Sequence, residues 1–279
     1  MGSTPQGDLS DKRTSALEPV WLLDLDGVVW LADDPISGSA QAVEELRSRG
    51  IRLVFVTNNS SLTLDEYVAK LDHHGIPADR GDMMTSALAA ASLVEEGNVV
   101  LACGGPGVTE ALEGRGAKVL LPEDESIRNG AFPLSIDCVV VGWDRKFDFD
   151  RLAVTASAAR KCGRLIGTND DATYPTGHGL LPGSGSILAA VAKASGVEPV
   201  VAGKPYQVMA DMVSQRWGRV EYMVGDRPST DGLMAKRIGC HFALVDSGVT
   251  PAGTEVIDPP PYRRAADLSA LVKIVAGDE

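Results

Sequence analysis

The stretch VWLLDLDGV, residues 20–28, holds an apolar run that ends in two aspartates and a glycine. Four apolar residues followed by a turn signal predict a short buried strand from Val20 to Leu23. Side chains two apart on a strand share a face, so Asp24 and Asp26 should point into the same crevice. Gly27 lets the chain turn away directly afterwards. The stretch therefore predicts a strand that delivers two carboxylates to one place.

On both sides of this stretch, short apolar runs alternate with amphipathic segments. A helix is expected near Ser39–Arg49, followed by a strand at Ile51–Val56. A second helix should begin at Thr63, where Thr63 and Glu66 have the spacing of a capping box, and should end at Gly75. This βαβ rhythm is typical of an α/β fold with a parallel sheet.

The same rhythm extends to the end of the chain. Further strands are expected at Val99–Ala102, Val119–Leu121, Cys138–Val141, Pro199–Ala202, Val220–Val224 and Phe242–Val245. Further helices are expected at Tyr206–Arg216, from Thr230 onward and at Ala266–Val275. Residues 1–18 are polar and lack periodicity, which predicts a flexible N-terminal tail.

The composition narrows the class of protein. The 279 residues include 38 acidic and 26 basic side chains, a formal charge of -12, which argues against a nucleic-acid partner. No apolar stretch approaches the roughly 18 to 20 residues of a membrane span, and the first residues contain no hydrophobic signal core. We therefore expect a soluble, cytoplasmic protein without a membrane partner, built from one or two domains.

Several predicted strands end in polar residues of the types found in catalytic sites. The carboxyl ends of parallel strands form one edge of the sheet, and ligands bind there at the point where the strand order reverses. The residues expected to meet at this edge are Asp24, Asp26, Thr57, Asn58, Lys204, Asp226 and Asp231.

These residue types point to phosphoryl transfer. Asp24, Asp26 and Asp226 would have to take up protons at neutral pH unless a cation neutralised them. Hard oxygen ligands without His or Cys favour Mg²⁺. Lys204 and the Thr57 hydroxyl would supply the positive charge and the hydrogen bond that a phosphoryl group needs.

Four motifs in order resemble those of the haloacid dehalogenase superfamily. They are Asp24–Val28, Thr57–Asn59, Gly203–Pro205 and Gly225–Asp231, the last with Arg227-Pro228-Ser229 where relatives commonly carry a Leu and an apolar residue. Within the superfamily the chain is similar to the NagD-like, p-nitrophenylphosphatase-type branch, which includes phosphoglycolate, glycerol-phosphate and pyridoxal-phosphate phosphatases. The resemblance covers nearly everything from Trp21 to Val275.

The resemblance implies a domain plan. A Rossmann-like catalytic core with a parallel sheet would comprise residues 19–86 and 182–279. An α/β cap domain, residues 87–181, would be inserted between its halves and would cover the crevice. Such caps often also form the interface of a homodimer, which the resemblance implies for this chain.

The resemblance also implies roles for single residues. Asp24 would be the nucleophile and Asp26 the general acid and base, with Thr57 and Lys204 completing the catalytic set. Mg²⁺ would be bound by Asp24, the Asp26 backbone carbonyl and Asp226, with Asp231 in the outer shell. The residues expected to bind phosphate or the rest of the substrate are Thr57, Asn58, Asn59, Lys204, Asn169 and Asp171.

The function expected from these residues and motifs is a Mg²⁺-dependent phosphatase that hydrolyses a small cytosolic phosphomonoester through an aspartyl-phosphate. Glycerol 3-phosphate and phosphoglycolate come first as substrates, and a nucleoside monophosphate or pyridoxal phosphate second. An alternative is a non-catalytic protein that binds a phosphorylated ligand. The presence of both Asp24 and Asp26 speaks against it, because binding alone needs neither a nucleophile nor an acid.

Overall fold

A computed structural model describes residues 18–128, 135–176 and 179–277. The tail expected at residues 1–18 lies outside these ranges except for Glu18. Among the helices described, none combines the length and apolar character that crossing a bilayer requires.

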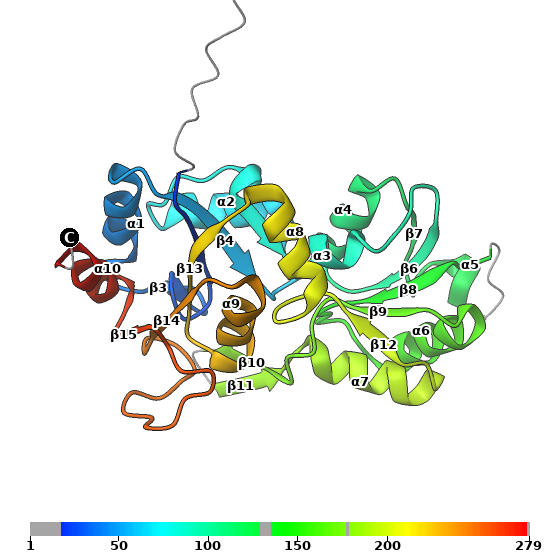
Figure 1. Ribbon diagram of the computed structural model, residues 1–279. Helices are drawn as coiled ribbons and strands as arrows, with labels where there is room; N and C mark the ends of the chain where they lie inside the picture. Colours follow the sequence, from blue (N-terminus) through cyan, green and yellow to red (C-terminus); the bar gives the residue numbers. More distant parts are fainter. Residues whose placement is uncertain (1–17, 129–134, 177–178, 278–279) are drawn as a thin grey trace, which may run out of the picture.

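A six-stranded parallel sheet forms the lobe that contains both ends of the described chain (Figure 1). Its order is β15 (Arg263–Ala265), β14 (His241–Val245), β13 (Val220–Gly225), β1 (Val20–Leu23), β4 (Arg52–Thr57) and β5 (Met83–Thr85). From β1 the chain builds β4 and β5 on one side and later adds β13 to β15 on the other. The strand order therefore reverses at β1, so a crevice opens beyond its carboxyl end.

A second parallel sheet of five strands forms the other lobe (Figure 1). Its order is β12 (Pro199–Val201), β9 (Leu165–Gly167), β8 (Cys138–Val141), β6 (Val99–Cys103) and β7 (Lys118–Leu120). The edge strand β12 pairs with β9, and helix α7 (Ser184–Ser195) packs on this sheet. The expected return to the core at residue 182 therefore differs from the observed sheet membership, which keeps the chain in this lobe until Val201.

Helices cover both faces of the first sheet because its strands are apolar on both sides. Trp21 and Leu23 pack with one set of helices, whereas Leu22, on the opposite face, packs with another. The first set is α1 (Ser39–Ser48), α2 (Leu64–His73) and α10 (Leu268–Gly277). The second set is α3 (Ser86–Ala91), α8 (Gln207–Trp217) and α9 (Leu233–Ile238).

The second lobe is also layered. Helices α5 (Glu125–Arg128), α6 (Phe149–Cys162) and α7 cover one face of its sheet, and α4 (Pro106–Gly114) covers the other. Helix α3 contacts both α4 and α8, so the apolar cluster around Leu22 continues into the second lobe. One continuous cluster of buried apolar residues therefore extends through both lobes.

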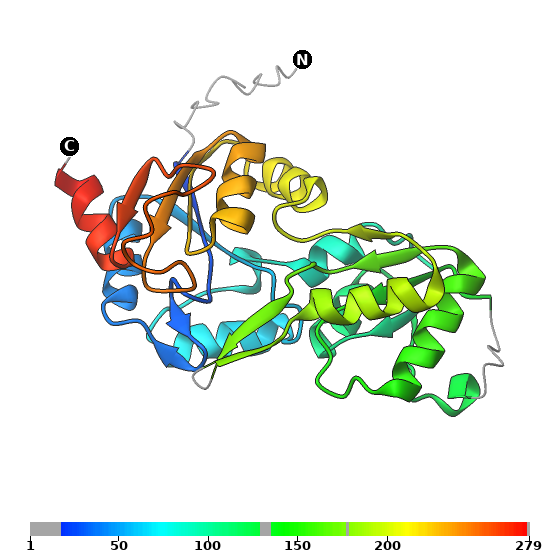
Figure 2. The ribbon, with the colours of Figure 1, turned by 90° about the horizontal axis from the view of Figure 1, so that it is seen from below.

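Two short hairpins complete the fold. One joins β2 (Trp30–Leu31) to β3 (Asp34–Pro35) near the turn after β1. The other, β10 (Thr173–Thr176) and β11 (Gly179–Pro182), reaches from the second lobe to the first in both views (Figures 1 and 2). It brings residues of the second lobe to the carboxyl edge of the first sheet.

In the first lobe the sequence predicted strands β1, β4, β13 and β14 and helices α1, α2, α8 and α10, but not β5, β15 or α3. The strands at Val20–Leu23 and Cys138–Val141 have the predicted bounds, and the other predicted elements differ by one or two residues at their ends. The helix expected from Thr230 begins instead as one π-helical turn, Pro228–Gly232, before α9. The prediction did not include α6, α7, β9 or the hairpin of β10 and β11.

The capping box at the start of α2 is present. The Glu66 backbone N–H donates to the Thr63 hydroxyl at 3.3 Å, and the Thr63 backbone N–H donates to the Glu66 carboxylate at 2.7 Å. We expect Thr63→Ala to lower the free energy of unfolding by about 1 kcal/mol because it leaves a helix N–H without its acceptor. Urea unfolding measures the change. Thr63→Ser keeps the acceptor, so an equal loss in both variants would contradict this explanation.

Candidate active site

The loop after β1 holds Asp24 in place from two sides. The Asp24 backbone N–H donates to the Val224 carbonyl on β13 at 2.9 Å, and the Leu25 N–H donates to Asp24 Oδ1 at 2.8 Å. Gly27 turns the chain with a φ of +85°, and a Cβ there would lie 2.5 Å from Asp226 Oδ2. Gly27 is therefore needed both for the turn and for the space that Asp226 occupies.

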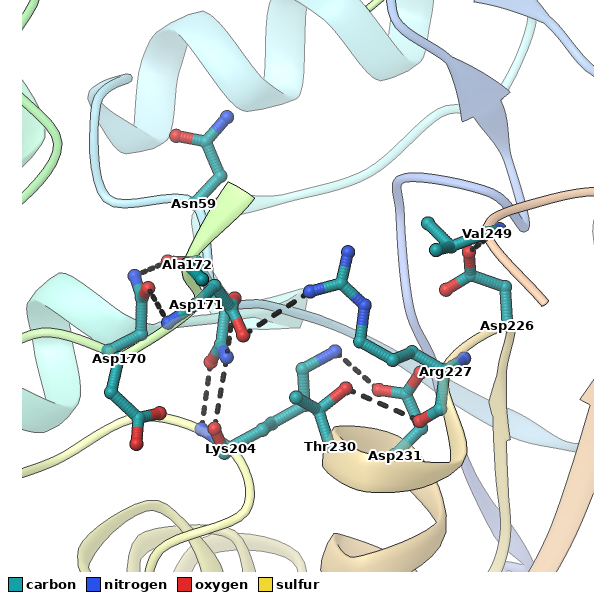
Figure 3. Close-up of polar contacts among 12 residues, drawn as sticks. Asn59, Asp170, Asp171, Ala172, Lys204, Asp226, Arg227, Thr230, Asp231 and Val249 are labelled. Atoms are coloured by element: carbon teal, nitrogen blue, oxygen red, sulfur yellow. Dashed lines mark hydrogen bonds and ion pairs between the residues drawn. The ribbon is translucent and has the colours of Figure 1, made fainter. Parts of the chain in front are cut away.

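Three carboxylates meet at this edge of the sheet. Asp24, Asp226 and Asp231 each offer an oxygen, and these atoms lie within 4.8 Å of one another. Asp226 follows β13 and accepts the Val249 N–H at 2.5 Å, and Asp231 lies in the π-helical turn (Figure 3). All three residues are buried. The sequence predicted that they converge, and the structure brings them together.

This cluster has more negative charge than its protein partners neutralise. Burial raises the pKa of Asp24 well above its ordinary range; Lys204 opposes the shift, whereas Asp231 and Asp226 add to it. Burial and the charge of Asp231 raise the pKa of Asp226 to about 6. Hard carboxylate oxygens that hold an excess of negative charge suit a divalent cation such as Mg²⁺. The donor set therefore fits the metal that the sequence predicted.

Lys204 is the cation at the centre of the cluster. Its ammonium lies 2.9 Å from Asp24 Oδ1 and 2.7 Å from Asp231 Oδ1, and it also donates to the Val56 carbonyl at 3.3 Å. Burial alone would lower the pKa of Lys204, but the charges of Asp231 and Asp24 outweigh burial and raise it. Lys204 therefore stays charged although only 1% of the residue is exposed.

Asn58 fixes the loop that carries Lys204. Its side-chain Nδ2 donates to the Lys204 carbonyl at 3.0 Å, and its Oδ1 accepts the Lys204 N–H at 2.8 Å. Nδ2 also donates to Asp171 Oδ2 at 3.0 Å. The Asn58 side chain thus joins the loops after β4 and β12, because its polar atoms already have protein partners.

Thr57 and Asn59 flank this amide and differ in direction. Thr57 is buried, and its hydroxyl accepts the Asn59 N–H at 3.1 Å at the carboxyl end of β4. The Asn59 Oδ1 accepts both the N–H and the hydroxyl of Ser61, and its side chain lies apart from the carboxylates in Figure 3. Thr57 is thus at the predicted place, whereas the Asn59 side chain stabilises its own turn.

Asp26 lies beside the carboxylate cluster and has partners from two lobes. Its Oδ1 accepts the Trp30 indole N–H and the Tyr174 hydroxyl, each at 3.2 Å. Burial raises the pKa of Asp26, against the charge of Lys70 and these two hydrogen bonds. Tyr174 comes from hairpin β10–β11 and lies 4.7 Å, ring centroid to centroid, from Trp143. The second lobe therefore contacts the predicted acid directly.

Asn169 and Asp171, predicted from the second lobe, reach the same edge. The Asn169 amide donates to the Asn58 carbonyl at 2.6 Å, and its Oδ1 accepts the Asp171 N–H at 3.1 Å. Asp171 Oδ1 lies 3.4 Å from Arg227 Nη1 (Figure 3). Burial raises the pKa of Asp171, against Arg227 and the Asn58 hydrogen bond. These residues tie the second lobe to the loops of the first.

One cavity at the carboxyl edge of the first sheet collects these groups. Its lining includes Asp24, Asp26, Thr57, Lys204 and Asp226, and from the second lobe Trp143, Asp171 and Tyr174. The sequence did not assign Trp143, Tyr174 or Arg227 to the site. Nothing local marks the two aromatic residues, because their place depends on how the second lobe folds over the first.

The chain is similar to known hydrolases along most of its length. The family model described as haloacid dehalogenase-like hydrolase matches residues 21–118, and a second model of this type matches residues 201–271. An acid sugar phosphatase of Staphylococcus saprophyticus is 32% identical over 260 residues, which cover 91% of this chain and 96% of the relative.

Solved structures show the same similarity. The p-nitrophenyl phosphatase from Archaeoglobus fulgidus has a TM-score of 0.81 and 26% identity, covering 92% of this chain and 99% of that one. The glycerol phosphate phosphatase from Mycobacterium tuberculosis in complex with magnesium has a TM-score of 0.79 and 33% identity, covering 91% and 76%.

We expect Mg²⁺ to stabilise the fold more strongly as the pH rises through about 6. The pKa of Asp226 is raised in the folded state from 3.8 to about 6, so the folded chain binds more protons than the unfolded chain between these values. The metal-free protein therefore loses stability as the pH rises through this window, whereas Mg²⁺ binding gains because it needs ionised carboxylates.

Thermal unfolding with Mg²⁺ and with chelator, between about pH 5 and pH 7, measures this difference. Asp226→Asn removes the titrating ligand and should flatten the pH dependence. A Mg²⁺-induced shift of equal size at every pH would contradict the assignment.

Proposed function

Since this chain belongs to the haloacid dehalogenase-like hydrolases, as a phosphatase of the p-nitrophenylphosphatase type, we propose that it hydrolyses small phosphomonoesters with the aid of Mg²⁺. The reaction would proceed in two steps through an aspartyl-phosphate on Asp24. One observation carries the proposal: a buried carboxylate, Asp24, lies 2.9 Å from the buried Lys204 ammonium, at the point where the strand order reverses.

In the first step, the Asp24 carboxylate attacks phosphorus and the bond from phosphorus to the alcohol oxygen breaks. Asp26 gives its proton to the departing oxygen, so a neutral alcohol leaves. In the second step, Asp26 removes a proton from water, which attacks phosphorus, releases inorganic phosphate and restores Asp24. The raised pKa of Asp26 supports this role because a general acid must still hold its proton near neutral pH.

The metal would be held by Asp24, by the Asp26 backbone carbonyl and by Asp226. When bound, Mg²⁺ would offset the negative charge of the carboxylates and of the phosphoryl group. Asp231 fits an outer position because its Oδ1 pairs with Lys204 and its Oδ2 accepts the Arg227 N–H at 3.1 Å. Asp226 is fixed by the Val249 N–H and by close packing against Gly248, where a Cβ would lie 1.9 Å from Asp226 Oδ2.

The phosphoryl oxygens would be bound by Lys204 and by the Thr57 hydroxyl. Lys204 is rigid because Asn58 holds both polar atoms of its backbone. Fixed donors of this kind stabilise transition-state charge without reorganising. We therefore assign the Asn58 side chain to positioning the lysine.

The second lobe would be the cap. We propose cap bounds of residues 87–201, which extend the expected 87–181 to include α7 and β12. The Tyr174 hydroxyl on Asp26, together with the Asp171 contacts to Asn58 and Arg227, supports a cap that closes the crevice and excludes water.

Small phosphate esters such as glycerol 3-phosphate and phosphoglycolate are our first candidates for the substrate. The relatives named above act on sugar phosphates, glycerol phosphate and p-nitrophenyl phosphate by their names, which supports a small alcohol as the leaving group. The Trp143 and Tyr174 rings favour a second candidate, an ester with a ring, such as pyridoxal phosphate or a nucleoside monophosphate. A substrate panel decides between these.

Asp24→Asn should lower Mg²⁺-dependent phosphate release by at least about 10³-fold, because an amide cannot form the aspartyl-phosphate. The assay uses p-nitrophenyl phosphate and a panel of small phosphate esters, with Mg²⁺ and with chelator. Asp72→Asn, an exposed aspartate on α2, is the matched control and should keep full activity. Turnover that survives in Asp24→Asn would exclude this mechanism.

Asp26→Asn should affect substrates according to their leaving group. The leaving group of glycerol 3-phosphate is glycerol, whose alkoxide is strongly basic and therefore needs a proton from the acid. The first-step rate for this ester should fall by about 10²- to 10⁴-fold. p-Nitrophenolate needs no proton, so formation of the aspartyl-phosphate from its ester should fall far less, as a burst of p-nitrophenol in rapid-mixing kinetics would show. Equal losses for both esters would argue against Asp26 as the acid.

A further inference from the structure

Arg227 directs its side chain into the cavity from a rigid backbone. Its N–H donates to Asp231 Oδ2 at 3.1 Å, and its carbonyl accepts the Asp231 N–H at 2.8 Å. The side chain lines the cavity and extends from the Asp226 side toward Asp171 (Figure 3). Arg227 therefore contributes a guanidinium to the cavity that Asp24, Asp26 and Asp226 also line.

The two cations that line the cavity have different surroundings. Lys204 is buried and pairs with two carboxylates at 2.7 and 2.9 Å. Within the described part of the chain, the Arg227 side chain pairs with one carboxylate, Asp171, at 3.4 Å. Charge-assisted hydrogen bonds to carboxylates are shorter, about 2.7–2.9 Å, and a guanidinium has five donors. Arg227 thus has donors to offer a ligand, whereas Lys204 is already engaged.

Asp171 is held by two hydrogen bonds to other residues. Its Oδ2 accepts the Asn58 amide at 3.0 Å, and its N–H donates to Asn169. Only Oδ1 faces Arg227, and its distance of 3.4 Å leaves the pair loose. A second carboxylate that approached Arg227 would compete with a weak contact rather than with a tight ion pair.

Resting on the proposed function, we propose that Arg227 selects phosphomonoesters whose alcohol part carries a second anionic group, a carboxylate first. The planar guanidinium matches a carboxylate through two parallel hydrogen bonds, which the lysine cannot do. Four acidic side chains also line the cavity, and their negative charge disfavours a substrate carboxylate: Asp24, Asp26, Asp171 and Asp226. Arg227 would offset this repulsion for esters whose carboxylate reaches it, so those esters would bind preferentially.

The test compares esters that differ in one group. 3-Phosphoglycerate and glycerol 3-phosphate carry a carboxylate and a hydroxymethyl group at the same position, and phosphoglycolate is a shorter carboxylate. We expect the native chain to prefer the carboxylates. Arg227→Gln should lower kcat/KM for 3-phosphoglycerate by about 10- to 100-fold more than for glycerol 3-phosphate, mainly through KM.

Three further variants sharpen the result. Arg227→Lys keeps the positive charge but cannot donate two parallel hydrogen bonds. It should therefore recover part of the preference for carboxylate esters. Asp171→Asn keeps an acceptor for Asn58 but removes the competing charge, so it should increase the preference for carboxylates. Arg216→Gln is the matched control, because Arg216 lies on the surface against the Trp217 ring and should leave the preference unchanged.

A readout without turnover uses the Asp24→Asn chain with Mg²⁺. 3-Phosphoglycerate should raise its melting temperature more than glycerol 3-phosphate does, and Arg227→Gln should remove that difference. Equal losses for both esters would overturn the inference and place Arg227 on the transferred phosphoryl group, and a preference that persists in Arg227→Gln would overturn it as well. A chain that hydrolyses no ester in the panel refutes the proposed function instead, whereas the binding comparison still decides on Arg227.

Discussion

The buried ammonium of Lys204 is the interaction on which the site depends. A buried charge is costly unless it is paired, so Asp24 and Asp231 must both lie within reach of it. These residues come from loops after β1, after β12 and after β13, and Val56 of β4 supplies a further acceptor. The lysine therefore fixes the relative positions of four chain segments that are far apart in the sequence.

One cation does not neutralise this cluster, and the remaining charge explains its chemistry. Asp24 and Asp226 have raised pKa values because burial and neighbouring carboxylates disfavour their ionised forms. A divalent cation would remove that penalty, and a phosphoryl group would then meet donors that are already in place. In the proposed mechanism, the excess of negative charge that is unfavourable within the protein would favour the binding of a metal and a phosphate together.

The sequence predicted what depends on local pattern and on the geometry of parallel strands. Asp24, Thr57 and Asp226 follow apolar strands, so their meeting at one edge could be deduced. The direction of the Asn58 amide could not, because it depends on the loop that carries Lys204. Strand β12 was assigned to the wrong sheet because its three residues, Pro199–Val201, fit either sheet equally well by sequence. The contact of Tyr174 with Asp26 could not be predicted either, because it depends on how the second lobe folds.

The two lobes contribute different kinds of residue to the site. The first lobe supplies the carboxylates, Lys204 and Thr57, to which the proposed mechanism assigns the steps at the phosphoryl group. The second lobe supplies Trp143, Asp171 and Tyr174, which lie where the alcohol part of a substrate would sit. Arg227 belongs to the first lobe but pairs with Asp171 of the second, so it connects the two sets of residues. If the proposed mechanism holds, a change on the second lobe would alter which alcohol fits while the first-lobe groups keep their positions.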